Sequence, residues 1–447
     1  MLIYIHVPFC HSKSNYCAFT SWQPEPGETA VYLENLLDEI ALWGERLGRV
    51  PVHTVFIGGG TPSLLPPAAI GALLDKLDKT FITFPEMEIS MEANPQSGRS
   101  AQYYSDLLRA GVNRLSLGVQ SLNDSTLRMM GRPHNSSDAI KAMHDAREAG
   151  FSNINLDFMW GLPGQRVRQW KEDLKYVAQH LKPEHLSCYG LTIEEHTPFY
   201  ELNLKKELKI ANERELGHMF MDGAEILEEC GYMQYEISNF SKLGFQCKHN
   251  LGYWAGRDYL GLGPGAVSTI QAKRWTNPYD FQTYVTQITK KMPPANLEEL
   301  DLRTKVLELI MLNLRTNKGL DAVAYRKLTG NDFFAENRGL INALHAKQLI
   351  RIRNKHLMLT RSGMLVSNTI LSHMFESVPQ LAGATTKELE GNAMQAGQLA
   401  ERAQAGQRVQ ALQAGNSQAL QAGKLAKPIS PRKVAVTPKN AVSRNKQ

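Results

Sequence analysis

Six short apolar runs alternate with stretches in which apolar residues recur every three or four positions, and this alternation constrains the fold most. The runs predict strands over Leu2–Phe9, Val52–Gly59, Met87–Asn94, Arg114–Ser121, Ile154–Gly161 and His185–Thr192. The spacing predicts helices over Tyr32–Arg46, Pro67–Lys79, Ala101–Ala110, Ser136–Ala149 and Val167–His180. Strands that alternate with helices are typical of parallel β/α units, so we expect an α/β fold with a partial (β/α)6 TIM-type barrel.

In such barrels the chemistry lies on the loops that follow the strands. The second predicted strand runs into Gly58–Pro62, whose glycines let backbone amides approach an anion or carboxylate closely. Glu92, Gln120 and Asp157 stand near the ends of the third, fourth and fifth strands. Each alone is as often a helix cap or a loop hydrogen bond. Together they predict a mouth that grips a ligand bearing an amine and ribose hydroxyls.

A polar loop after the first predicted strand holds Cys10 and Cys17, seven residues apart. Thiolate sulfur suits iron–sulfur clusters, which usually take closely spaced cysteines from one loop. The five cysteines of the chain are too few and too scattered for a disulfide framework. The loop therefore predicts a metal site.

The length of 447 residues exceeds what one core normally fills, so we expect several units. Helices over Leu300–Leu314, Leu320–Lys327 and Phe333–Lys347, followed by a hairpin around Asn354, predict a winged-helix-like domain. The sequence beyond Phe375 is rich in Ala, Gln, Gly and Lys and predicts disorder. The expected divisions are a barrel at 1–240, a connecting segment at 241–296, the C-terminal domain at 297–375 and the tail at 376–447.

The formal charge of +6 lies in the tail, which carries 10 Lys and Arg against 4 Asp and Glu from Glu376 onward. The rest of the chain has 40 residues of each sign, so we expect no nucleic-acid partner. The sequence has no apolar run of eighteen residues and no signal-peptide pattern at its start. These features predict a cytoplasmic protein.

His249 lies two residues after Cys247 and opens the run His249–Trp254. Imidazole and thiolate both ligate heme iron, and neighbouring aromatic side chains can pack on a porphyrin. A single histidine is more often a surface or hydrogen-bonded residue than a ligand.

Eight segments resemble, in order and spacing, the oxygen-independent coproporphyrinogen III oxidase-like branch of the radical S-adenosylmethionine (SAM) family, a branch of heme chaperones. They lie between Met1 and about Phe375. They are Tyr4–Cys10, Gly58–Ser63, Glu92–Pro95, Leu115–Ser121, Gly131–His134, Asn155–Pro163, Tyr235–Phe240 and His249–Trp254.

The resemblance implies three cofactors. A [4Fe-4S] cluster is implied in the loop of Cys10, Ser14 and Cys17, and heme at His249, with Cys247 as a second candidate. SAM is implied at the residues that match the family's cofactor contacts. These are Tyr4, Gly59, Gly60, Thr61, Glu92, Gln120, Arg132 and Asp157.

The family uses three cluster cysteines. Cys10 and Cys17 match the first and the third, and this chain has Ser14 in place of the second. A hydroxyl is a harder and far less acidic donor than a thiol, so four interpretations stay open. The cluster is weakened or lost in a natural member; the position is engineered or erroneous; the cluster survives with Ser14 or an outside ligand; or the two cysteines are unrelated.

The resemblance favours a chaperone that binds heme and delivers it to acceptor proteins, some of them membrane-associated. The true oxidase carries a further cysteine two places after the last, where this chain has Phe19. The alternatives are an oxygen-independent coproporphyrinogen III oxidase of porphyrin biosynthesis and a non-catalytic interaction protein.

Overall fold

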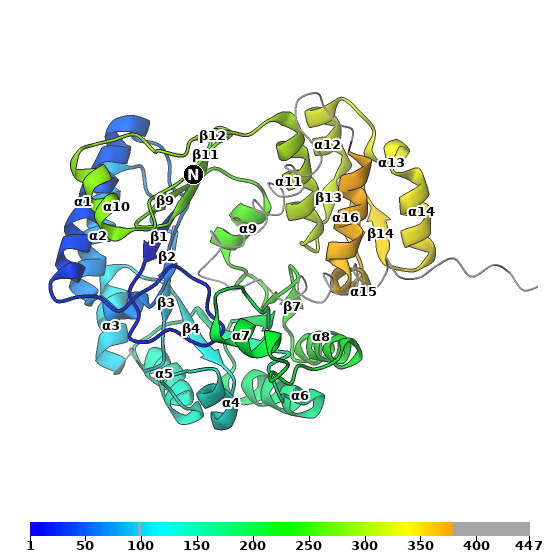
Figure 1. The fold of residues 1–447 in the computed structure, drawn as a ribbon, viewed down its shortest axis with the longest axis horizontal. Coiled ribbons are helices and arrows are strands. Elements are labelled where there is room, and N and C mark those ends of the chain that lie inside the picture. Colours follow the sequence, from blue (N-terminus) through cyan, green and yellow to red (C-terminus); the bar gives the residue numbers. More distant parts are fainter. Residues whose placement is uncertain (97–99, 379–447) are drawn as a thin grey trace, which may run out of the picture.

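The computed structural model describes residues 1–96 and 100–378. Its central feature is a run of six parallel strands in chain order, each within two residues of a predicted strand (Figure 1). All but one are buried along most of both faces, which explains why apolar residues occur on both faces of these strands. The partial α/β barrel is therefore confirmed. The strands are β1 (Leu2–Val7), β2 (Thr54–Gly59), β3 (Glu88–Ala93), β4 (Arg114–Gln120), β5 (Ile154–Trp160) and β6 (His185–Gly190).

Helices follow these strands and cover the outside of the sheet, as the amphipathic stretches predict (Figure 1). Among the α-helices described before residue 240, three were not predicted: α4 (Asp124–Met129), α7 (Pro198–Leu204) and α8 (Glu213–Glu229). The predicted helices are α1 (Glu28–Leu47), α2 (Pro67–Thr80), α3 (Ala101–Ala110), α5 (Ser136–Glu148) and α6 (Val167–Tyr176).

The sheet continues beyond the six strands at both edges. Strand β9 (Tyr259–Leu262) pairs in parallel with β1, and three antiparallel strands follow it. At the other edge an antiparallel strand pairs with β6. The segment expected to connect two domains thus also extends the barrel sheet. The added elements are β7 (Met233–Gln234), β8 (Asn239–Ser241), α9 (Lys248–Trp254), β10 (Val267–Ile270), β11 (Lys273–Thr276), α10 (Phe281–Thr289) and β12 (Glu298–Glu299).

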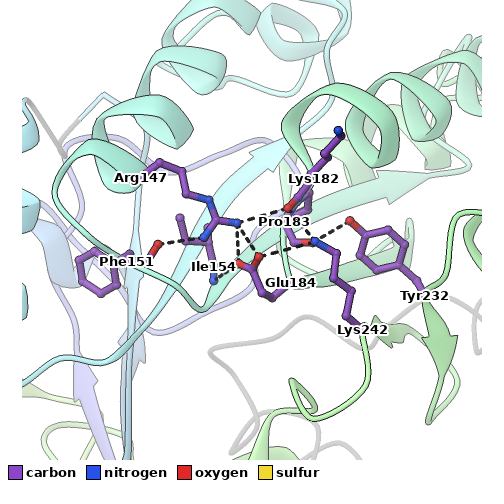
Figure 2. A network of polar contacts seen from close by, with 8 residues as sticks. All are labelled: Arg147, Phe151, Ile154, Lys182, Pro183, Glu184, Tyr232 and Lys242. Carbon is purple, nitrogen blue, oxygen red and sulfur yellow. Dashed lines mark hydrogen bonds and ion pairs between the residues drawn. The ribbon is translucent and has the colours of Figure 1, made fainter.

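A network of charged groups fastens the elements at the entry to β5 and β6 (Figure 2). Glu184 accepts hydrogen bonds from Arg147 of α5 at 2.6 and 2.7 Å and from the Ile154 amide at 3.2 Å. Lys242, just after β8, lies 3.6 Å from the same carboxylate and donates to the Lys182 carbonyl at 3.0 Å. The network joins a helix and three strands at the end of the barrel where the parallel strands begin. The predicted site lies at the opposite end, where these strands finish.

The C-terminal part of the described chain packs helices against a small sheet of three strands. The predicted hairpin is present, with Asn354 and Lys355 both at positive φ (50° and 62°), as a two-residue turn requires. The predicted helix Phe333–Lys347 is divided at Asn337, and residues 379–447 of the predicted tail lie outside the described residues. The elements are α11 (Leu302–Leu314), β13 (Leu320–Asp321), α12 (Ala322–Thr329), α13 (Phe333–Glu336), α14 (Arg338–Ala346), β14 (Ile350–Arg353), β15 (His356–Leu359), α15 (Arg361–Leu365) and α16 (Ser367–Ser377).

No helix in the two described ranges combines the length and the apolar character that a membrane span needs.

Candidate cofactor site

A pocket lies at the carboxyl ends of the barrel strands. It gathers ten of the twelve residues that the sequence predicts for the cofactor and metal sites. The two that it does not gather are Tyr4 and His249. The ten are Cys10, Ser14, Cys17, Gly59, Gly60, Thr61, Glu92, Gln120, Arg132 and Asp157.

The cysteine loop lies directly against the glycine turn after β2. The Cys10 Sγ is 3.4 Å from the Thr61 Oγ1. A Cβ atom on Gly60 would stand 2.6 Å from the Phe9 carbonyl oxygen and 3.0 Å from the Cys10 Sγ, so only glycine fits there. The close approach brings the backbone of the turn within reach of whatever the thiols hold.

Two buried carboxyl groups form one wall of the pocket. The Gly59 amide donates to Glu92 at 3.2 Å, and burial, with the nearby Asp157, raises the pKa of Glu92 well above its usual value. Asp157 accepts from the Ser116 hydroxyl at 3.1 Å and the Asn155 amide at 2.8 Å, and burial raises its pKa as well. Oxygen acceptors held in this way suit the amine and hydroxyl groups of a ligand.

Gln120 reaches the pocket through an irregular end of β4. The register between β4 and β5 shifts between Leu117 and Gln120, and Gln120 has a positive φ of 69°. Its Oε1 is buried and has no hydrogen-bond partner within the described ranges. Because buried acceptors are nearly always satisfied, this oxygen points to a donor on a bound ligand.

Ser14 is held in the pocket by Arg132, whose Nη1 donates to the Ser14 Oγ at 3.3 Å. Its Nη2 donates to the Gly118 carbonyl at 3.1 Å, and burial lowers the pKa of Arg132 to about 10. Burial raises the pKa of the Cys17 thiol to about 11. The Ser14 hydroxyl therefore takes part in a hydrogen bond with a guanidinium group, a role that a hard oxygen fills well.

The donor set fits SAM and does not complete a [4Fe-4S] site. Glycine amides, carboxyl oxygens and an unsatisfied amide oxygen line one pocket, as a nucleoside with an amino-acid tail needs. The loop offers only the Cys10 and Cys17 thiols to iron, beside a serine oxygen. In the described part of the chain no group of three His, Cys, Asp or Glu side chains is arranged to hold a metal ion.

Tyr4 and His249 lie inside the protein, away from the lining of this pocket. The Tyr4 hydroxyl is 3.1 Å from the His6 Nδ1, and its ring stacks on Phe56. His249, at the start of α9, is 1% exposed, and its Nδ1 is 2.8 Å from the Thr54 Oγ1. Burial lowers the pKa of His249 to about 3, so its ring is neutral, and a heme could reach it only if α9 moved.

Tyr189 is a pocket residue that the sequence did not suggest. It lines the pocket from β6, and its side chain is 1% exposed. Period-two alternation along the predicted strand His185–Thr192 places Ser187 and Tyr189 on one face, which is the signal that could have identified it.

Comparison with known proteins places the chain in a family. It matches the radical SAM superfamily over residues 4–177 and the HemN C-terminal domain over residues 300–366. The heme chaperone HemW of Bacillus subtilis is 34% identical over 369 residues, 82% of this chain and 97% of the relative. That of Mycobacterium tuberculosis H37Rv is 32% identical over 373 residues, 83% of this chain and 93% of the relative.

A solved structure has a similar fold. The coproporphyrinogen III oxidase HemN of Escherichia coli, described as a radical SAM enzyme, matches with a TM-score of 0.71 at 25% identity. The match covers 84% of this chain and 89% of HemN. The radical SAM superfamily implies SAM and a [4Fe-4S] cluster as cofactors. With relatives matched over nearly their whole length, the chain belongs to the HemW family of radical SAM proteins.

Proposed function

We propose that this protein binds heme and delivers it to acceptor proteins. The observation that carries the proposal is the match to heme chaperones over 97% of the length of the Bacillus subtilis relative. The pocket supports it, because one of its lining residues is Phe19. This residue stands where the resemblance expects a further cysteine in the oxidase. Acceptors in the cytoplasm, including proteins attached to a membrane, are part of the proposal.

We infer that the pocket binds SAM through the predicted residues. The Gly59 and Gly60 region would face the methionyl carboxylate, and Glu92, Gln120 and Asp157 the amine and ribose hydroxyls. A complete reduced cluster beside SAM would supply radical chemistry. Because this loop provides two thiols in place of three, we assign the pocket a binding role and no radical step.

The function is tested by titrating the purified full-length chain with hemin and recording the Soret band. A saturable change in the band, followed by transfer of the heme to apomyoglobin, is expected. Unchanged spectra at saturating hemin would contradict the proposal. Decarboxylation of coproporphyrinogen III with release of 5′-deoxyadenosine under anaerobic conditions would favour the oxidase.

A further inference from the structure

A second hollow lies at the opposite end of the barrel from the cofactor pocket. Thr54 begins β2, and Met87 stands one residue before β3, so the hollow opens where these strands enter the sheet. The far side is formed by α9, the helix that carries the predicted heme motif. Its lining is His53, Thr54, Phe84, Glu86, Met87, Lys248, Leu251, Gly252 and Arg257.

His53 presents an accessible imidazole at this hollow. Its ring stacks on Phe84, with centroids 5.7 Å apart and an angle of 1° between the planes, and Phe84 is itself 42% exposed. Partial burial, the chain's terminal ammonium group and Arg257 lower the pKa of His53. The ring is thus neutral near pH 7, and a neutral imidazole nitrogen has the lone pair that heme iron requires.

The rest of the hollow combines apolar side chains with positive charge. Phe84, Met87 and Leu251 offer apolar surface to a flat ring. Lys248 and Arg257 are exposed at the edge, and the Met1 ammonium group lies close enough to Asp258 and Arg257 for both charges to affect its pKa, Asp258 raising it and Arg257 lowering it. The acidic groups nearby are Glu86 and Asp258 at the surface and the buried Glu88, which the first amides of α9 already occupy, so the exposed edge keeps Lys248 and Arg257 free to face an anion.

His249 supports this hollow from behind. Thr54 lines the hollow and joins the His249 ring at 2.8 Å. Glu88 accepts from the amides of Lys248 and His249 at 2.9 and 3.0 Å, which fixes the start of α9. The buried histidine therefore helps to set the helix that turns Lys248 and Leu251 toward the hollow.

We propose that this hollow is the heme site, with His53 as the axial ligand and Lys248 and Arg257 facing the propionates. This inference rests on the proposed heme-binding function and names its site. One porphyrin face would lie against Phe84, Met87 and Leu251. His249 is a positioning residue that acts through Thr54 and α9.

The test compares hemin binding by the full-length wild-type chain and by His53→Ala. Loss of the ligand is expected to weaken hemin binding about tenfold or more and to shift the Soret band, and added imidazole should restore the band. The matched control is His180→Ala, because His180 is also exposed and stacked on an aromatic ring, that of Tyr176 at 4.7 Å. This control should bind hemin as the wild type does.

A second comparison tests the cationic edge. The double variant Lys248→Ala, Arg257→Ala should bind hemin more weakly and bind the dimethyl ester of hemin as the wild type does, because the ester has no propionate charge. An equal loss for both ligands would overturn the assignment of this edge.

The outcomes distinguish a wrong heme site from a wrong function. A wild-type chain that binds no hemin overturns both. If His53→Ala binds as the wild type does, while His249→Ala loses the band and keeps its melting temperature, the heme site is at His249 and the inference is wrong. The proposed function would stand.

Discussion

At the scale of single residues, Ser14 stands where the family resemblance expects a cluster cysteine. It lines the pocket with Cys10 and Cys17, is 6% exposed, and accepts a hydrogen bond from Arg132. Replacing Ser14 by Cys supplies a third soft ligand, because a thiol ionises more readily and binds iron more strongly than a hydroxyl. The variant should hold more iron and sulfide per chain after anaerobic reconstitution than the wild type.

The matched control for this prediction is Ser12→Cys. Ser12 lines the same pocket and is more exposed than Ser14, so the variant adds a thiol to the same loop at the wrong position. It should leave the iron and sulfide content at the wild-type level. Equal contents in the wild type and Ser14→Cys would show that the serine oxygen, or an outside ligand, already completes the site.

Single residues also mark the limit of what the sequence predicts. Ten pocket residues were predicted: Glu92, Gln120, Asp157 and the glycine turn from strand ends that converge in space, the two cysteines from their spacing, and Ser14 and Arg132 through the family resemblance. The burial of His249 was not, because an aromatic motif does not reveal which face of its helix packs inward. The hollow that includes His53 was not predicted either, because it combines parts of the chain near residues 53, 86 and 250.

At the scale of elements, helix α9 depends on a carboxylate from a neighbouring strand. Glu88 is buried at the start of β3 and accepts from the Cys247 thiol at 3.5 Å as well as from the first amides of α9. It is also a charged neighbour of the fully buried Arg114. Glu88→Gln should lower the free energy of unfolding by about 2–3 kcal/mol, since a buried charged acceptor is lost.

Urea unfolding of Glu88→Gln measures this effect, with Glu86→Gln as the control. Glu86 is exposed two residues earlier in the chain, so its substitution should change the unfolding free energy by less than about 0.5 kcal/mol. Similar losses of unfolding free energy in both variants would mean that the hydrogen bonds between Glu88 and the start of α9 add no stability of their own.

Element boundaries were predicted best where the pattern is long and regular. The six parallel strands are largely apolar runs bounded by glycine, proline or polar residues, and their ends agree within two residues. Short elements such as α4, capped by Asn123, have too few turns to show a period. The break at Asn337 between α13 and α14 escaped prediction because apolar residues continue at helical spacing across it.

At the scale of the whole molecule, one buried carboxyl group joins the first helix to the last strands of the sheet. Glu39 of α1 accepts from the Gly263 amide at 2.8 Å, the Asn277 amide at 2.7 Å and the Tyr284 hydroxyl at 2.8 Å. Residues 263–284 lie more than 220 positions further along the chain. The contact therefore holds the β9–α10 region against the start of the barrel.

This arrangement predicts a pH-dependent stability. Burial raises the pKa of Glu39 from 4.5 to about 7, so the folded chain keeps a proton that the unfolded chain has lost. The folded state binds more protons between these values, and stability contributed by this group falls as the pH rises from about 4.5 to about 7. A shift of this size corresponds to about 3 kcal/mol.

Glu39→Gln, which cannot titrate, should remove that part of the slope of unfolding free energy against pH. Glu34→Gln, an exposed glutamate of the same helix, should keep it. A wild-type slope retained in Glu39→Gln would assign the proton uptake to another group, of which the buried Glu236, with a pKa also raised to about 7 by burial, is the first to examine.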